Sequence, residues 1–380
     1  MTPLNPRPRY ALAEIIFQIS VILLATLTCG AILVIAGNFI SAKFFGFSMM
    51  SGEVDYMSLT SNQLLGFKIT QSFYSIGAFI LPPVIFAQII RKNTLEYYGL
   101  LKASKWHKYL FAILLWAVFY PFVIWVYELN DQLDFSLFGA MGEQAEAAAK
   151  TADDLTTRML EANNLGQLFI NLFVVALLPA IGEELFFRGM VQKVLMSWTG
   201  LAHLAIWSSA IIFSAIHGQF DGFLPRMLLG AFFGYLFFWS GNLKLTILAH
   251  FVNNGSAVVM NYLYQHEMSS FNPDENPGML LGLMSLVFSI PLLYVFYRNT
   301  RKQDLKVISD KANVMWTIVY TTPNVHHAAI VHDKLLDEGY NAVIVNKSDT
   351  AYGGVFGTVE VHVPQNEVES ALARIKEMNL

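Results

Sequence analysis

The chain has 380 residues, of which 55% are apolar and 14% are charged. Soluble domains carry about 25% charged residues, so this composition excludes an ordinary soluble protein and indicates a membrane protein. The formal net charge of −4 argues against a nucleic-acid partner, and the single cysteine, Cys29, excludes a disulfide framework and a thiolate metal site.

Apolar stretches of spanning length follow one another along the first 300 residues. A transmembrane helix needs about 20 mostly apolar residues. We therefore predict an α-helical polytopic membrane protein with about eight transmembrane helices in one domain over residues 1–300. The predicted spans are Ile15–Ile40, Ile69–Ile90, Tyr109–Tyr127, Leu168–Phe187, Leu201–His217, Phe223–Trp239, Leu245–Leu263 and Met279–Tyr297.

Positive charges fall in alternate connections between these spans. Arg7 and Arg9 precede the first span and Arg298 follows the last, whereas the opposite connections are acidic. The positive-inside rule then predicts that both termini face the cytoplasm, in the plasma (inner) membrane. The long connection Gly139–Asn164 is rich in Ala, Glu and Gln, and we expect it to form a polar helix on the outer surface.

The composition becomes that of a soluble domain after a short linker over residues 301–313. Residues 314–380 predict a small cytoplasmic α+β domain with the element order βαββα. This part resembles a bacterial domain family of unknown function that is described as signal-transducing, which leaves its ligand or partner open. Three histidines on its first helix are interpreted as a solvated helix face rather than a metal site. The predicted strands are Met315–Thr321, Asn341–Asn346 and Gly357–Val363, the helices are Val325–Glu338 and Val368–Met378, and the histidines are His326, His327 and His332.

Three charged residues lie together inside the fourth apolar span, in the stretch Pro179–Gly189. A charged side chain at membrane depth costs about 2.5–3.5 kcal/mol, so such residues mark functional sites more often than not. Glu184 and Arg188 are four apart and are predicted to pair. Glu183 is rotated about 100° from Glu184 around the helix and has no such partner, which makes it the candidate general base. The alternative is an ion-pair cluster that only holds helices together.

Two further polar pairs follow on later spans. Phe213 and His217 share a helix face, so the phenyl ring is expected to pack against the imidazole. Glu183 and His217 are nearly equidistant from the turn near Gly200, which would hold them at similar depth, within reach of one water molecule. His250 and Asn254 also share a face, while Asn253 points elsewhere.

The position of His250 creates a conflict of depth, because it lies only a few residues beyond the turn near Asn242. Glu183, His217 and His250 can meet only if the hairpin around Gly200 extends further into the cytoplasm. The polar segment Arg188–Ser197 would allow this extension, and it would leave Gln192 and Ser197 outside the lipid.

The order Glu-Glu-x-x-x-Arg, Phe-x-x-x-His and His-x-x-x-Asn on successive apolar spans resembles the CPBP family of intramembrane proteases, which includes CAAX prenyl proteases and bacteriocin-processing (Abi) proteins. The resemblance covers about residues 165–264. It implies an intramembrane endopeptidase whose catalytic residues are Glu183, His217, His250 and Asn254, with Glu184 and Arg188 completing the first motif. It also implies a peptide or membrane-protein substrate taken from the bilayer, which leaves open whether that substrate is prenylated.

Other chemistries remain open at this point. Glu183, His217 and His250 have the residue types of a catalytic zinc site, although the chain lacks the His-Glu-x-x-His helix, and family usage includes both metal-dependent and glutamate-dependent descriptions. Acid–histidine clusters also form ion or proton sites in transporters. A non-proteolytic membrane scaffold or sensor that acts through the C-terminal domain is a third possibility.

Overall fold

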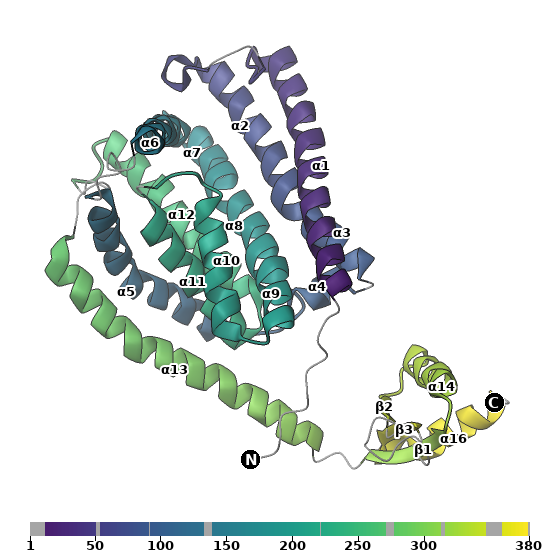
Figure 1. Cartoon of the computed structure of the whole chain (residues 1–380). Helices are drawn as coiled ribbons and strands as arrows, with labels where there is room; N and C mark the ends of the chain where they lie inside the picture. Colours follow the sequence, from purple (N-terminus) through teal and green to yellow (C-terminus); the bar gives the residue numbers. More distant parts are fainter. Residues whose placement is uncertain are drawn as a thin grey trace. The chain divides into compact units, whose positions relative to one another are not determined.

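The computed structural model describes residues 12–50, 54–90, 92–132, 139–220, 222–270, 277–312, 316–346 and 359–378. The chain forms two compact units, Met1–Arg298 and Asn299–Leu380. The first unit is helical and the second contains the sheet (Figure 1).

Two long rods contain the three π-helical segments of the described residues, and the last helix of the first unit continues past Arg298. The helices are α1 (Leu12–Phe45), α2 (Ser61–Ser75), α3 (Leu81–Ile89), α4 (Thr94–Tyr97), α5 (Trp106–Asp131), α6 (Ala140–Leu160), α7 (Leu165–Asn171), α8 (Leu178–Glu183), α9 (Gln192–Thr199), α10 (Ala202–Ala215), α11 (Phe223–Ser240), α12 (Leu243–Gln265) and α13 (Gly278–Ala312), with a 3₁₀ turn η1 (Tyr56–Ser58) and π-helical segments η2 (Ile76–Ile80), η4 (Leu172–Leu177) and η5 (Glu184–Val191).

Two of the π-helical segments have a local cause. Proline lacks the amide hydrogen that the helix ladder needs, and its ring collides with the carbonyl one turn earlier. Pro82 and Pro179 are each the second residue after a π-helical segment, η2 and η4 respectively. The wider π turn accommodates each proline without ending the helix. The rod Leu165–Thr199 therefore continues through α7, η4, α8, η5 and α9.

Six helices of the described chain are long and apolar enough to cross a membrane: Ala13–Phe45, Ser61–Ile89, Trp106–Asp131, Leu165–Thr199, Phe223–Ser240 and Gly278–Thr300. This confirms the multi-pass helical class. Two of the eight predicted spans are helices outside this set. One is α10, which has only 14 residues. The other is α12, where Lys244, His250 and the asparagine pair interrupt the apolar run.

The core of the first unit contains two large aromatic clusters and two smaller clusters. One large cluster joins α3 and η5 to α10 and α11 through Phe86, Phe187, Phe213 and Phe237. The other large cluster joins α5 and α11 to α12 and α13, and Phe296 of α13 is buried in it. The helix α6 is the predicted polar helix of the long outer connection, and Figure 1 shows it lying across one end of the bundle.

Glycines bring the rod Leu165–Thr199 close to its neighbours. A Cβ atom on Gly182 would lie 3.0 Å from the Cβ atom of Phe79, and one on Gly189 would lie 2.8 Å from Cδ1 of Tyr98. A larger residue at either position would force the neighbouring side chain to move. The rod is thus packed closely against η2 and against Tyr98, which follows α4, along the stretch that carries the charged residues.

The second unit confirms the βαββα order. Its strands β1 (Trp316–Thr322), β2 (Val343–Asn346) and β3 (Val359–Pro364) form an antiparallel sheet in the order β1-β3-β2, and α14 (Val325–Asp337) and α16 (Val368–Glu377) share its apolar core, with a 3₁₀ turn η6 (Gln365–Glu367) before α16. The helix α13 runs on to Ala312, so the predicted linker is helical up to that residue. His327 is exposed and His332 contacts Asp333, while the first two residues of the predicted third strand lie outside the described residues.

Candidate active site

The pair predicted between Glu184 and Arg188 is present and fully buried. Nη1 of Arg188 donates to Oε1 of Glu184 at 2.7 Å, and Nη2 donates to the carbonyl oxygen of Gly230 on α11 at 3.0 Å. The guanidinium lies over the rings of Phe213 and Phe233, 4.8 and 5.4 Å from their centroids. These contacts satisfy a charge that would otherwise be very costly in the interior. Arg188 therefore ties η5 to α11.

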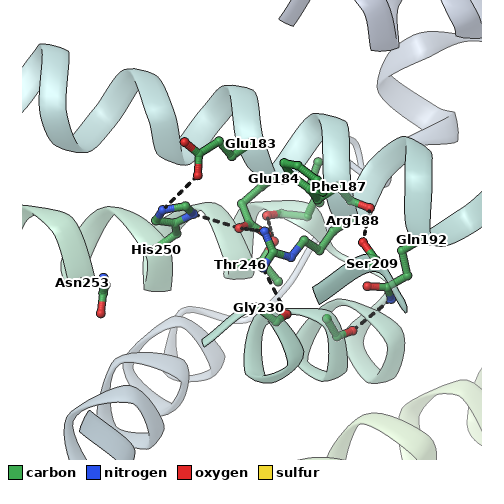
Figure 2. Close-up of polar contacts among 12 residues, drawn as sticks. Glu183, Glu184, Phe187, Arg188, Gln192, Ser209, Gly230, Thr246, His250 and Asn253 are labelled. Atoms are coloured by element: carbon green, nitrogen blue, oxygen red, sulfur yellow. Dashed lines mark hydrogen bonds and ion pairs between the residues drawn. The ribbon is translucent and has the colours of Figure 1, made fainter. Parts of the chain in front are cut away.

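His250 lies between the two glutamates (Figure 2). Its Nδ1 is 2.9 Å from Oε1 of Glu184, and its Nε2 is 3.7 Å from Oε2 of Glu183. The ring also stacks on Phe233, with centroids 5.1 Å apart. Two carboxylates and a stacked ring leave the imidazole a single orientation. The approach of His250 to Glu183 agrees with the expectation that these two residues meet, whereas the contact of His250 with Glu184 was not predicted.

Glu183 has no charged partner one turn further along its own helix, as predicted, but its Oε2 lies 3.7 Å from Nε2 of His250 on α12. The predicted difference between the two acids is nevertheless present. The side chain of Glu183 is 15% exposed and that of Glu184 is 0% exposed. Oε1 of Glu184 serves both Arg188 and His250, whereas Glu183 borders open space.

His217 follows the C-terminal end of α10, and the predicted packing on Phe213 is confirmed. The two ring centroids are 5.1 Å apart, and Nδ1 of His217 is 2.8 Å from the carbonyl oxygen of Phe213. A carbonyl oxygen only accepts, so Nδ1 carries the hydrogen in this contact. The neutral ring then presents Nε2 as a hydrogen-bond acceptor.

The asparagines of α12 form a short relay. Trp116 of α5 donates through Nε1 to Oδ1 of Asn253 at 2.9 Å, and Nδ2 of Asn253 donates to Oδ1 of Asn254 at 3.0 Å. Nδ2 of Asn254 donates to the carbonyl oxygen of Val175 at 3.2 Å. Asn253 thus points away from the face of His250 and Asn254, toward Trp116 on α5, as predicted. Its amide also reaches the side chain of Asn254, which was not predicted.

Two cavities meet at the site. The first has a volume of about 420 Å³ and lies among α2, α6, η4 and α8, with a mostly apolar lining that includes Phe67, Tyr74 and Met159. The second has a volume of about 350 Å³ and lies among α5, α11 and α12, with Tyr120, Tyr127 and Arg226 in its lining. The residues that line both cavities are Glu183, His217 and Asn254. The structure thus brings Glu183 and His217 to one space, although they make no direct contact there.

The polar segment after Arg188 was expected to extend out of the lipid, but part of it packs inside the protein. Gln192 is buried and donates through Nε2 to the carbonyl oxygen of Gly234 on α11 at 3.1 Å. Lys193 lies over the ring of Tyr97, 4.5 Å from its centroid. Gln192 therefore lies inside the protein, where it supports the same helix pair as Arg188. The depth of the hairpin around Gly200 in a bilayer stays a prediction.

The described residues show no ready-made group of ligands for the zinc alternative, since no three His, Cys, Asp or Glu side chains are grouped as metal ligands among them. Nδ1 of His217 is bonded to a backbone carbonyl and Nδ1 of His250 to Glu184, contacts that orient a histidine ring with or without a metal. The zinc alternative therefore stays a prediction, and no step below is assigned to a metal.

Comparison with known proteins gives a family for this part of the chain. Residues 165–256 match the family model of the type II CAAX prenyl endopeptidase Rce1-like proteins. The chain is also similar to an uncharacterized protein, YpbD, of Bacillus subtilis (strain 168), with 28% identity over 86 residues. That alignment covers 22% of this chain and 41% of YpbD, so the chain spans less than half the length of this relative. No solved structure shows a significant match.

The matched segment contains every residue of the three motifs, from Glu183 to Asn254. It also contains the relay and the helix contacts that hold those residues, apart from Trp116 on α5. Residues 165–256 therefore form an Rce1-like domain.

Proposed function

We propose that this protein is an intramembrane endopeptidase in which Glu183 activates a water molecule. The observation that carries the proposal is the contrast between two consecutive glutamates. Glu184 is sealed inside the protein and bonded to Arg188 and His250, whereas Glu183 borders both cavities. Adjacent acids of the same type with opposite access to solvent are suited to separate tasks, one positional and one chemical.

Glu183 and His217 together can hold the attacking water. Both line the space where the cavities meet, and Nε2 of His217 is a hydrogen-bond acceptor for one water hydrogen. The carboxylate of Glu183 takes the other hydrogen as the water oxygen attacks the peptide carbonyl carbon. Glu183 then returns that proton to the amine nitrogen as the carbon–nitrogen bond breaks. Water is consumed, and a carboxylic acid and an amine are released.

The developing oxyanion needs donors, and Asn254 is available for this role. One N–H of its amide is used by the carbonyl oxygen of Val175, and the residue borders both cavities. His250 lies on the same helix face, and because its Nδ1 hydrogen is directed to Glu184, it becomes a second donor, through Nε2, in its imidazolium form. A single donor of this kind contributes about 2.7–4 kcal/mol in soluble proteases. Asn253 and Trp116 fix the amide of Asn254 and are positioning residues.

The first cavity favours an apolar substrate. Its lining contains Phe67, Tyr74, Phe79 and Met159, and its volume of about 420 Å³ accommodates several side chains. We infer a peptide or membrane-protein substrate that enters from the bilayer, with both termini of the enzyme in the cytoplasm. Nothing in the lining selects a prenyl group over other apolar groups.

The decisive experiment compares new protein N-termini in membranes from cells carrying the wild-type chain or Glu183→Gln. Glu96→Gln is the matched control, because Glu96 is an exposed glutamate outside the site. Peptide ends should be present with the wild type and with Glu96→Gln and be absent with Glu183→Gln. Identical ends in all three, at equal protein abundance, would contradict the proposal and favour an ion or proton site.

A further inference from the structure

A third cavity is lined by two positively charged side chains and is separate from the proposed active site. It has a volume of about 150 Å³ and lies between the start of α2, the end of α6 and the start of α7. Lys68 and Arg158 supply positive charge to its lining, and Glu161 supplies the opposite charge. It shares no lining residue with the two cavities at Glu183. We call it the cationic pocket.

Lys68 has few partners for a buried ammonium group. Its residue is only 4% exposed, and Nζ donates to Oδ1 of Asn171 at 2.5 Å. That amide oxygen is the one acceptor that the described residues give to Nζ, which has three hydrogens to donate. Both amide hydrogens of Asn171 are directed to the carbonyl oxygens of Leu160 and Glu161, which fixes the amide. Two N–H groups of Lys68 are thus left for something in the pocket.

Arg158 also has a hydrogen-bond donor without a partner among the described residues. Its Nη1 donates to Glu161 and its Nη2 donates to the carbonyl oxygen of Leu59, which holds the end of α6 against η1. Its Nε is buried and has no hydrogen-bond partner within the described residues. A buried, unpaired donor on a charged group is costly, and here it accompanies an underused ammonium in one small cavity. The three charges in the lining leave a net charge of +1.

The position of the pocket along the membrane-spanning rods indicates what kind of ligand could reach it. Two membrane-spanning rods, Ser61–Ile89 and Leu165–Thr199, begin at this end of the first unit, where α6 also lies (Figure 1). The pocket residues occupy about the first two turns of each rod, which corresponds to the level of the lipid headgroups. Beside the pocket, Leu165, Phe169 and Ile170 of α7 are exposed apolar residues suited to acyl chains.

We propose that the cationic pocket binds the phosphate group of a membrane phospholipid. Phosphate is the abundant anion at this depth, and its oxygens accept several charge-assisted hydrogen bonds at once. The volume of about 150 Å³ is about five times that of one water molecule in the liquid, which accommodates a phosphate group and little more. A bound phosphate accepts from Lys68, the positive charge of Arg158 in the lining attracts it further, and the acyl chains lie along α7. This site does not depend on the proposed endopeptidase function.

The test measures thermal unfolding of the purified full chain in a phosphate-free detergent, followed by its tryptophan fluorescence. The additives are phosphatidylglycerol, a diacylglycerol with the same acyl chains, and inorganic phosphate. Phosphatidylglycerol should raise the midpoint temperature of the wild type in a saturable manner, because a ligand that binds only the folded state stabilises it. Diacylglycerol and inorganic phosphate should leave the midpoint unchanged. Stabilisation by inorganic phosphate, without an effect of the phospholipid, would overturn the assignment to lipid.

Three variants separate binding from folding. Lys68→Met should weaken the affinity for phosphatidylglycerol by about tenfold or more, because a charge-assisted hydrogen bond is lost. Lys193→Met is the matched control, since it removes another lysine of a spanning rod far from the pocket in the sequence, and it should bind as the wild type does. Glu161→Gln should bind more tightly, because it removes the competing carboxylate and releases Arg158. A misfolded variant cannot produce that gain, and unchanged affinity in both Lys68→Met and Glu161→Gln would overturn the proposal.

Discussion

Glu184 and His250 are 66 positions apart in the chain, and Oε1 of Glu184 lies 2.9 Å from Nδ1 of His250 in a fully buried contact. The same oxygen accepts from Arg188, so one carboxylate oxygen holds a histidine and an arginine on different helices. Oε2 of Glu184 has no hydrogen-bond partner within the described chain. This arrangement makes Glu184 the anchor of the cluster and leaves Glu183 to the cavities.

Replacing each of the two glutamates separately should have different effects, a loss of stability for Glu184 and a loss of cleavage for Glu183. Glu184→Gln removes a buried carboxylate that neutralises Arg188, a change that costs about 3–5 kcal/mol. Its unfolding midpoint should fall clearly, with loss of folded protein. Glu183→Gln should unfold close to the wild-type temperature and lose peptide cleavage. Thermal unfolding and the comparison of N-termini check the pair, and equal stability of the two variants would contradict the assigned roles.

His217 should be important for cleavage and unimportant for stability. The residue is exposed at the cavities, and its contacts are with Phe213 of its own helix. His217→Ala should therefore reduce the cleavage rate by about 10²–10⁴-fold, as loss of a group that takes part in proton transfer does. Its unfolding midpoint should remain near that of the wild type. His203→Ala, on the same helix, is the control and should retain cleavage; a large fall in stability of His217→Ala would show a structural role instead.

Gly189 should tolerate no side chain. A Cβ atom there would lie 2.8 Å from Cδ1 of Tyr98, whose hydroxyl is anchored to the carbonyl oxygen of Pro83 at 2.6 Å. Gly189→Ala should destabilise the first unit by about 1–3 kcal/mol, as overpacking does. Gly255→Ala is a matched change, because its Cβ atom would meet neighbours at ordinary distances of 3.7 Å or more. Thermal unfolding should separate the two variants, and equal midpoints would show that Tyr98 yields.

The second unit offers a test by pH. Nε of Arg374 donates to Oε2 of Glu338 at 2.6 Å, and this hydrogen bond lowers the pKa of Glu338. A lowered pKa in the folded state means that the contact stabilises the unit above the ordinary pKa of glutamate. The contribution is lost as the pH falls through the lowered value. A carbon-13 NMR titration of Glu338 in the full chain should give a midpoint below about 4.3, the ordinary value for glutamate.

Arg374→Gln supplies the control for that titration. Without the guanidinium, the pKa of Glu338 should rise toward its ordinary value, because the hydrogen bond from Arg374 is the largest cause of the shift. The same midpoint in both proteins would show that the contact does not form in solution.

Much of the fold followed from local pattern. The apolar runs predicted the spanning rods, and the composition after the last rod predicted the small α+β unit. Two local side-chain predictions for the first unit were also confirmed, the pair of Glu184 with Arg188 and the packing of Phe213 on His217. Both depend on residues four apart on one helix, where the helical repeat alone brings side chains together.

The sequence by itself therefore determined the class of the protein, the order of its motifs and the contacts within single helices. Tertiary structure alone decided that His250 lies between two glutamates, that Asn253 faces Asn254 and Trp116, and that Lys68 lies in a cationic pocket with Arg158. Each of these relationships joins different helices or depends on how one helix is rotated about its axis. Rotation and depth are set by how side chains of neighbouring helices interdigitate, and that information is spread over the whole interface rather than carried by any short motif.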